Sequence, residues 1–266
     1  MSALTQEISR RAVAAQSMAR LAGQSTLSLF QTERLQVDFK RDRSPVTEAD
    51  HKAEQILRDC ILGPFPQDSI LGEELGQVDG TSGFRWVLDP IDGTKSFIAG
   101  VPLYGTMVGL EHAGDPVAGV IYFPGLDEIV YAARGEGCWT CRANQIPRRT
   151  SVGTKSNLSE CTFLVTDVKS FAKCGAMPAY LALDNAALLT RSWGDCYGYY
   201  LVATGRADLM IDPILNCWDA VAAMPIIEEA GGRFCDWHGE RRTDSGNAVA
   251  ANEHLMPQVL EILRTV

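Results

Sequence analysis

The apolar residues of the chain recur at helical spacing near its start and at strand spacing in its middle. The segment TEADHKAEQILRDCIL places Ala53, Leu57 and Ile61 on one face behind Thr47, which predicts a helix with an N-terminal cap. From residue 103 to 140, apolar runs are separated by turn sequences such as AGDP. This pattern predicts an antiparallel meander of strands.

In the second half of the chain, segments with apolar residues at strand spacing alternate with segments at helical spacing. The segments TFLVTD, ADLMID and NAVAANE predict strands, and DCYGYYLVATG and CWDAVAAMPIIEEAGG predict helices. Such alternation after a meander favours an α/β fold, an α+β layered sandwich in which helices and sheets are stacked. We place a boundary near residue 151. Residues 1–150 are expected to form a lobe with a mixed, largely antiparallel sheet, and residues 151–266 a more α/β lobe.

Composition narrows the functions that such a fold can carry. The 266 residues are 46% hydrophobic, enough for a sizeable core, and a net charge of −9 with a pI near 5.0 argues against a nucleic-acid partner. Charged residues interrupt the apolar positions near the start, which predicts an amphipathic helix instead of a signal peptide, and no run is long enough to span a membrane. Eight cysteines scattered through apolar stretches indicate a reducing cytoplasm.

Several polar features have structural explanations. The basic run Phe39–Ser44 predicts a solvated loop. The pair Cys138 and Cys141 has no second pair to complete a zinc site, so it predicts a structural role. No two histidines stand at helical pair spacing, which gives a zinc enzyme little support. The four histidines are His51, His112, His238 and His254.

Acidic residues border apolar segments at three separate places. The stretch WVLDPIDGT ends a strand with Asp89 and Asp92, ILGEE ends another with Glu73 and Glu74, and NCWDAVAAM begins a helix with Asp219. No basic residue lies close to Glu73, Glu74 or Asp219 in sequence, so these carboxylates lack a local partner. The repetition favours convergence of these residues on one site.

Convergent carboxylates require a positive partner. At a separation of about 4 Å each pair would repel by about 4 kcal/mol at an effective dielectric of 20. A divalent cation would offset this repulsion, and all-oxygen ligands suit Mg²⁺. A cap for a helix that begins at Gly93 is the local alternative for Asp92.

The turn after Asp92 adds a second kind of site. A turn through Gly93 into a helix leaves the amides of Gly93 and Thr94 available to an anion such as phosphate. Metals beside an anion site favour hydrolysis of a phosphate ester by a two-metal mechanism. The ligand is therefore expected to be a small phosphorylated metabolite.

Three of these segments resemble the signature of the inositol monophosphatase family of Mg²⁺-dependent phosphatases: GEE at 72–74, DPIDGT at 89–94 and WDAVAAMPIIEEAGG at 218–232. The resemblance covers most of the chain and implies the alternating layers of helices and sheets that this family shares with fructose-1,6-bisphosphatase. It implies two or three Mg²⁺ ions, most of whose ligands belong to the first lobe. These ligands are Glu73, Asp89 and the carbonyl of Ile91 for the first ion, Asp89, Asp92 and Asp219 for the second, and Glu74 for a water or a third, weaker ion.

The resemblance also implies roles outside the metal ligands. Thr94 and Asp50 would activate the attacking water, and the loop 38–46 would be a mobile flap over the site. The sequence TEAD is also a capping box, which is the structural alternative for Asp50. Members of the family are commonly dimeric, so a homodimer is implied.

Within the family, the segment RSWGDCYGYYLVATGRADLMIDP is most similar to the histidinol-phosphate phosphatase branch. This similarity implies that Asp195 and Asp212 face a substrate ammonium and that Trp193 or Tyr197 contacts an imidazole ring. A helix N-cap is the alternative for Asp195. The expected reaction is hydrolysis of histidinol phosphate. The alternatives are an inositol-1-phosphate phosphatase, a broad sugar- or nucleotide-phosphate phosphatase, and a protein that senses a phosphorylated metabolite without turnover.

Overall fold

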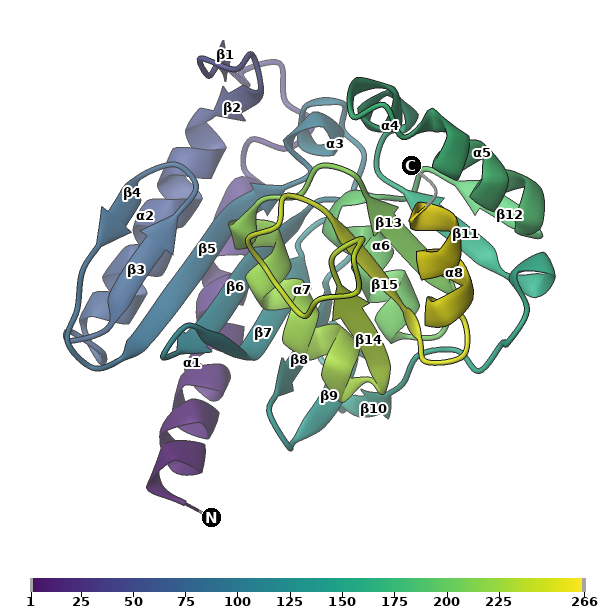
Figure 1. Ribbon diagram of the computed structural model, residues 1–266. Helices are drawn as coiled ribbons and strands as arrows, with labels where there is room; N and C mark the ends of the chain where they lie inside the picture. The colour runs from purple at the N-terminus through teal and green to yellow at the C-terminus, as the bar shows by residue number, and fades with distance from the viewer. Residues whose placement is uncertain (1, 265–266) are drawn as a thin grey trace.

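Helices and β-sheets form alternating layers in the computed structural model, which describes residues 2–264 (Figure 1). Helices α1 (Ala3–Thr26) and α2 (Glu48–Leu62) cover one face of a large sheet. Helices α6 (Asp195–Ala203) and α7 (Cys217–Glu229) lie between the other face of that sheet and a second sheet. The layered α+β sandwich predicted from the sequence is confirmed. The outer layer on the second sheet consists of α4 (Val168–Lys173), α5 (Met177–Ala186) and α8 (Met256–Leu263), with a short 3₁₀ helix, η1 (Leu158–Glu160), before it.

The large sheet has eight strands in the order β10-β9-β8-β7-β6-β5-β3-β4, and every pair is antiparallel except β3 with β5. Because β3 and β5 are parallel neighbours, their carboxyl ends meet at the same edge of the sheet. A separate hairpin of β1 (Val37–Phe39) and β2 (Pro45–Thr47) lies before α2. The strands of the large sheet are β3 (Ser69–Gly72), β4 (Gly76–Val78), β5 (Phe84–Asp92), β6 (Gly105–His112), β7 (Asp115–Phe123), β8 (Glu128–Ala133), β9 (Gly137–Arg142) and β10 (Arg148–Thr150).

The second sheet is mixed and has the order β12-β11-β13-β15-β14. The first three strands are parallel, and β13, β15 and β14 pair antiparallel. The expected boundary at residue 151 falls between the last strand of the large sheet and the first strand of this one. The strands are β11 (Thr162–Val165), β12 (Leu189–Arg191), β13 (Leu209–Asp212), β14 (Gly232–Cys235) and β15 (Ala248–Asn252).

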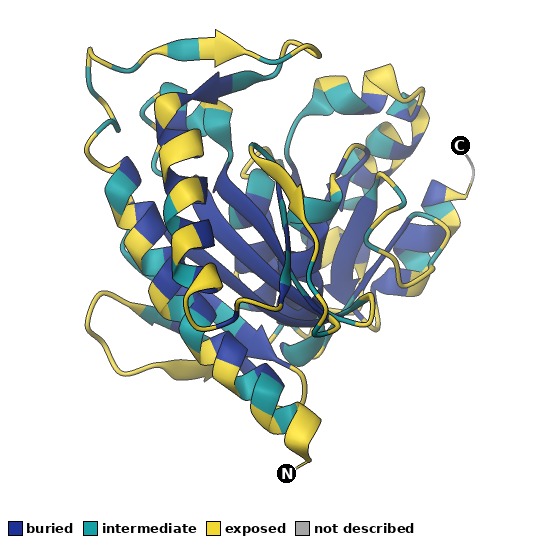
Figure 2. Ribbon diagram, turned by 90° about the vertical axis from the view of Figure 1, so that its left-hand side faces the viewer, coloured by how far each residue is buried: buried dark blue, intermediate teal, exposed yellow. Residues whose placement is uncertain are grey.

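Apolar side chains fill the spaces between the layers. The central strands are buried, whereas the outer faces of the outer helices are exposed (Figure 2). The cluster around α6 and α7 joins side chains from both halves of the chain, such as Ile121, Ile226 and Phe234. All eight cysteines are free; Cys138 lies in this core, and Cys174 is exposed. Among residues 2–264, no helix combines the length and apolar character needed to cross a membrane.

Two glycines allow α7 to approach the large sheet closely. A Cβ atom added to Gly119 of β7 would lie 2.0 Å from the carbonyl oxygen of Ala222, and one on Gly109 of β6 would lie 2.6 Å from a methyl group of Val221. Side chains at these two positions would push the helix away from the sheet. The backbone of α7 is therefore held directly against β6 and β7.

Candidate active site

The carboxyl ends of β3 and β5 place acidic residues at one edge of the large sheet. Glu73 follows β3, and its amide donates a hydrogen bond to a carbonyl oxygen of β5 at 3.1 Å. The pairing of β5 with β6 shifts between Asp89 and Asp92, around Pro90, which has no N–H to donate to the ladder. The amide of Ile91 donates a hydrogen bond to Oδ1 of Asp89 at 3.0 Å. The irregular strand end thus holds both aspartates beside Glu73.

Asp219 reaches the same point from the first turn of α7. Its carboxylate closes a capping box, because Oδ2 accepts a hydrogen bond from the amide of Asn216 at 3.1 Å. One oxygen from each of Asp89, Asp92 and Asp219 lies within 4.8 Å of the other two. The predicted convergence of these three residues is confirmed, and Asp219 has the structural task of a helix cap as well.

The electrostatics of this acidic cluster favour a bound cation. Burial and the neighbouring carboxylates raise the pKa of Asp89 and of Asp92 well above the usual range. Burial, with repulsion from Glu73, raises the pKa of Asp219 to about 7. The charged form of each group is therefore unfavourable without a positive partner. The donors are all oxygens, so the residues present fit a hard divalent cation such as Mg²⁺.

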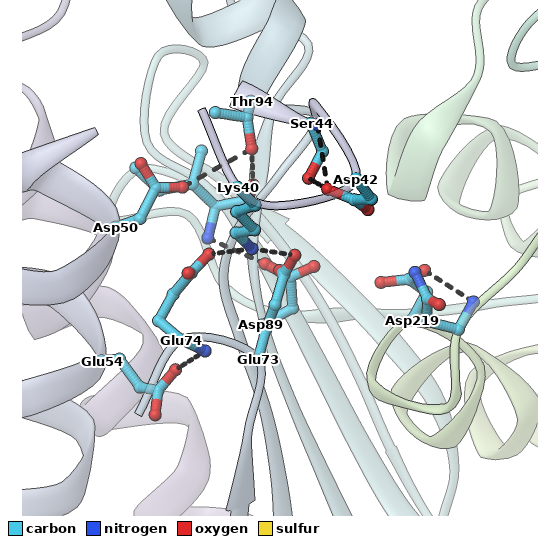
Figure 3. Close-up of polar contacts among 12 residues, drawn as sticks. Lys40, Asp42, Ser44, Asp50, Glu54, Glu73, Glu74, Asp89, Thr94 and Asp219 are labelled. Carbon is cyan, nitrogen blue, oxygen red and sulfur yellow. Dashed lines mark hydrogen bonds and ion pairs between the residues drawn. The ribbon is translucent and has the colours of Figure 1, made fainter. Parts of the chain in front are cut away.

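Lys40 supplies a positive charge to Glu73 and Glu74 from the hairpin before α2. Its ammonium donates hydrogen bonds of 2.7 Å to Oε1 of both glutamates (Figure 3). Although burial lowers the pKa of Lys40, the bonds to Glu73 and Glu74 raise it overall. Burial raises the pKa of Glu74 to about 7, against the opposing effect of Lys40. The expectation that the run Phe39–Ser44 is simply a solvated loop is wrong for Lys40.

Glu54 of α2 shapes the turn that carries these two glutamates. It is fully buried, and its carboxylate accepts hydrogen bonds from the amides of Glu74 and Leu75 at 2.7 and 3.1 Å. Arg58, one helical turn further on, neutralises it through an ion pair of 2.8 Å. Glu54 is not among the residues predicted from the sequence. Its only signal there is an acidic and a basic residue four positions apart on the apolar face of a predicted helix.

The ion pairs of Lys40 predict an effect on metal affinity. Substitution of Lys40 by Met should tighten binding of Mg²⁺ to the metal-free protein by about tenfold, because the cation no longer has to displace an ammonium worth about 1.5–3 kcal/mol. Calorimetric titration without substrate measures this directly. Arg41→Met, an exposed change in the same loop, is the matched control and should leave the affinity unchanged. Weaker binding by the Lys40 variant would show instead that the ammonium supports the metal.

Thr94 and Asp50 face each other across the site. The Thr94 hydroxyl lies 3.5 Å from Oδ1 of Asp50 and 3.1 Å from the carbonyl oxygen of Ile91, and its single proton can be donated to one of them at a time. The other oxygen of Asp50 accepts hydrogen bonds from the amide and hydroxyl of Thr47 at 2.8 and 2.6 Å. Burial raises the pKa of Asp50. The capping box is thus real, and it leaves one carboxylate oxygen directed at Thr94.

Gly93 forms the turn between β5 and the short helix α3 (Thr94–Ile98). Its φ of 85° lies in the left-handed region that glycine adopts without strain. Gly93 is itself the N-cap of α3, so the alternative in which Asp92 caps this helix is wrong. Asp92 instead accepts a hydrogen bond from the amide of Cys196 at the start of α6. The first amides of α3 have no acceptor within their own helix, which is the arrangement predicted for an anion site.

A small cavity of about 60 Å³ lies beside the acidic cluster and is lined by Asp195 and Thr166. Asp195 is the first residue of α6, with a φ of 50°, and Gly194 is the N-cap, so the N-cap alternative for Asp195 is wrong. The amide of Asp195 donates a 2.8 Å hydrogen bond to the Thr166 hydroxyl. Burial raises the pKa of Asp195 to about 6, although Lys95 lowers it. Thr166 is not among the residues predicted from the sequence, and its only signal there is its place near the end of the predicted strand TFLVTD.

The remaining predicted substrate residues have different surroundings. Asp212 lines the same cavity but is buried, accepts a 2.9 Å hydrogen bond from the Tyr199 hydroxyl, and has a pKa that burial raises to about 7. Trp193 is 42% exposed. The ring of Tyr197 packs edge-on against the core residue Phe123, with centroids 5.2 Å apart. The structure therefore brings the two aspartates, but neither aromatic residue, to the lining of this cavity.

The fold and the acidic site agree with the comparison to known families. The sequence profile of the inositol monophosphatase family matches residues 7–266. The chain belongs to this family of metal-dependent phosphatases, and it is a phosphoric monoester hydrolase.

Individual relatives agree with this assignment. A histidinol-phosphatase of Chlorobaculum parvum is 41% identical over 239 residues, which cover 90% of each chain. An inositol-1-monophosphatase of Rhizobium meliloti is 32% identical over 251 residues, covering 91% of this chain and 92% of the other. Among solved structures, the extragenic suppressor protein SuhB of Bartonella henselae superposes with a TM-score of 0.87 at 29% identity, covering 94% of this chain and 97% of the other.

Proposed function

We propose that the protein is a Mg²⁺-dependent phosphatase that hydrolyses L-histidinol phosphate to L-histidinol and phosphate. The observation that carries this proposal is the position of Asp195. Its carboxylate lines a cavity that opens beside the metal ligands, where the alcohol part of a phosphate ester would extend. A carboxylate there can pair with the ammonium group of histidinol phosphate, which inositol phosphate lacks. The similarity to the Chlorobaculum parvum histidinol-phosphatase supports the same substrate.

Different residues of the site would bind the metal ions, bind the phosphate and transfer the proton. Glu73, Asp89, Asp92, Asp219 and the carbonyl of Ile91 would hold two Mg²⁺ ions, and Glu74 would hold a water or a third ion. When bound, Mg²⁺ lowers the pKa of a coordinated water and neutralises charge on the leaving oxygen. The amides of Gly93 and Thr94 donate to the phosphate oxygens. The Thr94 hydroxyl accepts a proton from the attacking water while it donates its own to Asp50.

A substrate panel tests the proposal. Phosphate release from histidinol phosphate, inositol 1-phosphate and glycerol 2-phosphate is measured with the purified protein, with Mg²⁺ and with EDTA. The highest kcat/KM should be for histidinol phosphate, and activity should require Mg²⁺. Preference for inositol 1-phosphate would favour the first alternative, which the Rhizobium meliloti relative supports. Comparable rates on all three esters would indicate a broad-specificity phosphatase, and binding without phosphate release would indicate a sensor.

Asp195 is expected to determine selectivity without affecting the chemistry. Asp195→Asn should lower kcat/KM for histidinol phosphate by roughly ten- to a hundredfold, since a charged contact contributes about 1.5–3 kcal/mol. Activity on glycerol 2-phosphate, which has no cation, should change little and serves as the internal control. Asp212→Asn should have a smaller effect, because the Tyr199 hydroxyl already occupies that carboxylate. Equal losses on both esters would remove Asp195 from substrate recognition.

The proposal includes a homodimer in the cytoplasm. The resemblance to the family supports the dimer, and the free cysteines suit a reducing compartment. Sedimentation of the purified protein measures the oligomeric state.

A further inference from the structure

A second cavity, of about 250 Å³, opens at the β10 edge of the large sheet, beside the end of α6. Among the described residues it shares no lining side chain with the cavity at the acidic cluster. In the strand register Glu128 lies opposite Arg142, and Thr140 lies opposite Arg148. Because side chains alternate along a strand, these four project from the same face as the buried Val130. The inner face of the sheet, which is apolar at its centre, therefore becomes polar at this edge.

Three guanidinium groups line this cavity without an acidic partner. Among residues 2–264, none of Arg142, Arg148 and Arg206 forms an ion pair with a carboxylate. Arg241, elsewhere on the surface, behaves differently, because it pairs with both Glu228 and Asp115. The cavity has one acidic lining residue, so its lining carries two more positive than negative charges in a chain whose net charge is −9.

The aromatic wall of the cavity orients one of these groups. The guanidinium of Arg206 lies over the ring of Tyr200, 4.4 Å from its centroid, and its Nε donates a 2.9 Å hydrogen bond to the Thr204 hydroxyl. Stacking and this bond fix the plane of the guanidinium. Its two terminal nitrogens make no hydrogen bond to a described residue. They remain available to a planar or tetrahedral anion.

Glu128, in the wall of this cavity, has a buried carboxylate oxygen, Oε2. This oxygen has no hydrogen-bond partner of ordinary geometry among the described residues, although Arg142 lies directly opposite Glu128 in the sheet. A polar neighbour on the wall is Tyr200, whose pKa is raised by burial and by the Glu128 carboxylate. The Tyr200 hydroxyl, 3.2 Å from that of Thr140, lies on the same wall. A protonated oxygen, a hydroxyl or a water carried in with a ligand would satisfy the unpaired acceptor.

We infer that this cavity binds a small anion with two or more negative charges, carried by phosphate or carboxylate groups. Arginine forks bind such groups with two parallel hydrogen bonds, and three of them suit a ligand larger than a single chloride ion. Helix α6 begins at Asp195 in the candidate active site and carries Tyr200 in the wall of this cavity. A ligand here would therefore contact the helix that also borders the reaction site.

Titration of pyrophosphate into EDTA-treated protein tests this inference. Without metal, the carboxylates of the acidic cluster repel an anion, so the candidate active site does not contribute to the signal. Calorimetry should detect one site per chain in the parent protein. The double variant Arg142→Gln/Arg148→Gln should bind at least tenfold more weakly. The control Arg242→Gln/Arg264→Gln removes the same charge from exposed positions outside the cavity and should bind within twofold of the parent.

Each outcome of the titration either supports or overturns the anion site. A selective loss in the cavity variant supports the site, and a loss shared equally with the control shows non-specific attraction and overturns it. Absence of saturable binding in the parent also overturns it, whether the cavity is then empty or covered by a second copy of the chain. Melting temperatures of both variants, measured in the same buffer, verify that they are folded. The result does not depend on the substrate of the phosphatase.

Discussion

Asp219→Asn is expected to reduce phosphatase turnover by roughly 10³-fold or more while the protein remains folded. In the proposed role of Asp219 as a Mg²⁺ ligand, loss of its carboxylate removes several kcal/mol of charge stabilisation from a metal-assisted reaction, and about 4 kcal/mol corresponds to 10³-fold. Asparagine retains a side-chain oxygen that can accept the hydrogen bond from Asn216, so the cap of α7 is preserved. Steady-state rates with saturating Mg²⁺ and circular dichroism measure the two outcomes.

The metal-free form of this variant has a distinctive stability profile. Burial raises the pKa of Asp219 to about 7 in the folded protein, against about 4 in an unfolded chain. Between these values the folded state binds more protons, so the stability of the parent falls as pH rises from about 4 to about 7. The variant should therefore melt higher than the parent at pH 8 and lose this advantage near pH 4. Near-parent turnover, or a control Asp236→Asn that is equally inactive, would contradict the assignment of Asp219.

Thr94→Ala is expected to lower kcat by roughly 10²- to 10⁴-fold with little change in KM. A group that helps to deprotonate the attacking water acts mainly in the transition state, and this is the usual size of a general-base contribution. Thr94→Ser keeps a hydroxyl at the same position and should recover most of the rate. A variant that raised KM and left kcat intact would make Thr94 only a phosphate contact.

Asp50 requires a separate test because one of its oxygens caps a helix. Asp50→Asn keeps an oxygen for Thr47 but replaces the acceptor that faces Thr94 with an amide. It should reduce kcat on the same scale as Thr94→Ala, and the double variant should be far from additive because the two residues act as a unit. Additive effects would leave Asp50 as a helix cap alone.

The parts of the site that the sequence predicted are those set by strand ends and helix starts. Asp89 and Asp92 end a strand whose apolar pattern is plain, and Asp219 begins a helix whose period is equally plain, so their convergence follows once the segments are stacked. The turn at Gly93 could be predicted for the same reason, because an Asp-Gly pair marks a change of direction. The layered fold could be predicted from the order in which helix-spaced and strand-spaced apolar segments follow one another along the chain.

The parts that could not be predicted depend on packing between distant segments. Lys40 pairs with glutamates more than thirty residues away. No local sequence pattern predicts where the β1–β2 hairpin, which carries Lys40, packs against the rest of the protein. Tyr197 packs against the core residue Phe123, and this contact joins two segments that lie far apart in the sequence. The cap roles considered for Asp92 and Asp195 failed because glycines directly before each helix already hold those positions.

The close approach of α7 to the sheet at Gly109 and Gly119 has a consequence for local unfolding. Because the backbone of α7 packs directly against the sheet, α7, β6 and β7 should not unfold locally one by one. Their amides should therefore exchange with deuterium only through global unfolding. Asp219 is thereby held in place relative to Asp89 and Asp92 before any ion arrives. Binding of Mg²⁺ at the proposed site would then order little of the chain, so its affinity would lose little to conformational entropy.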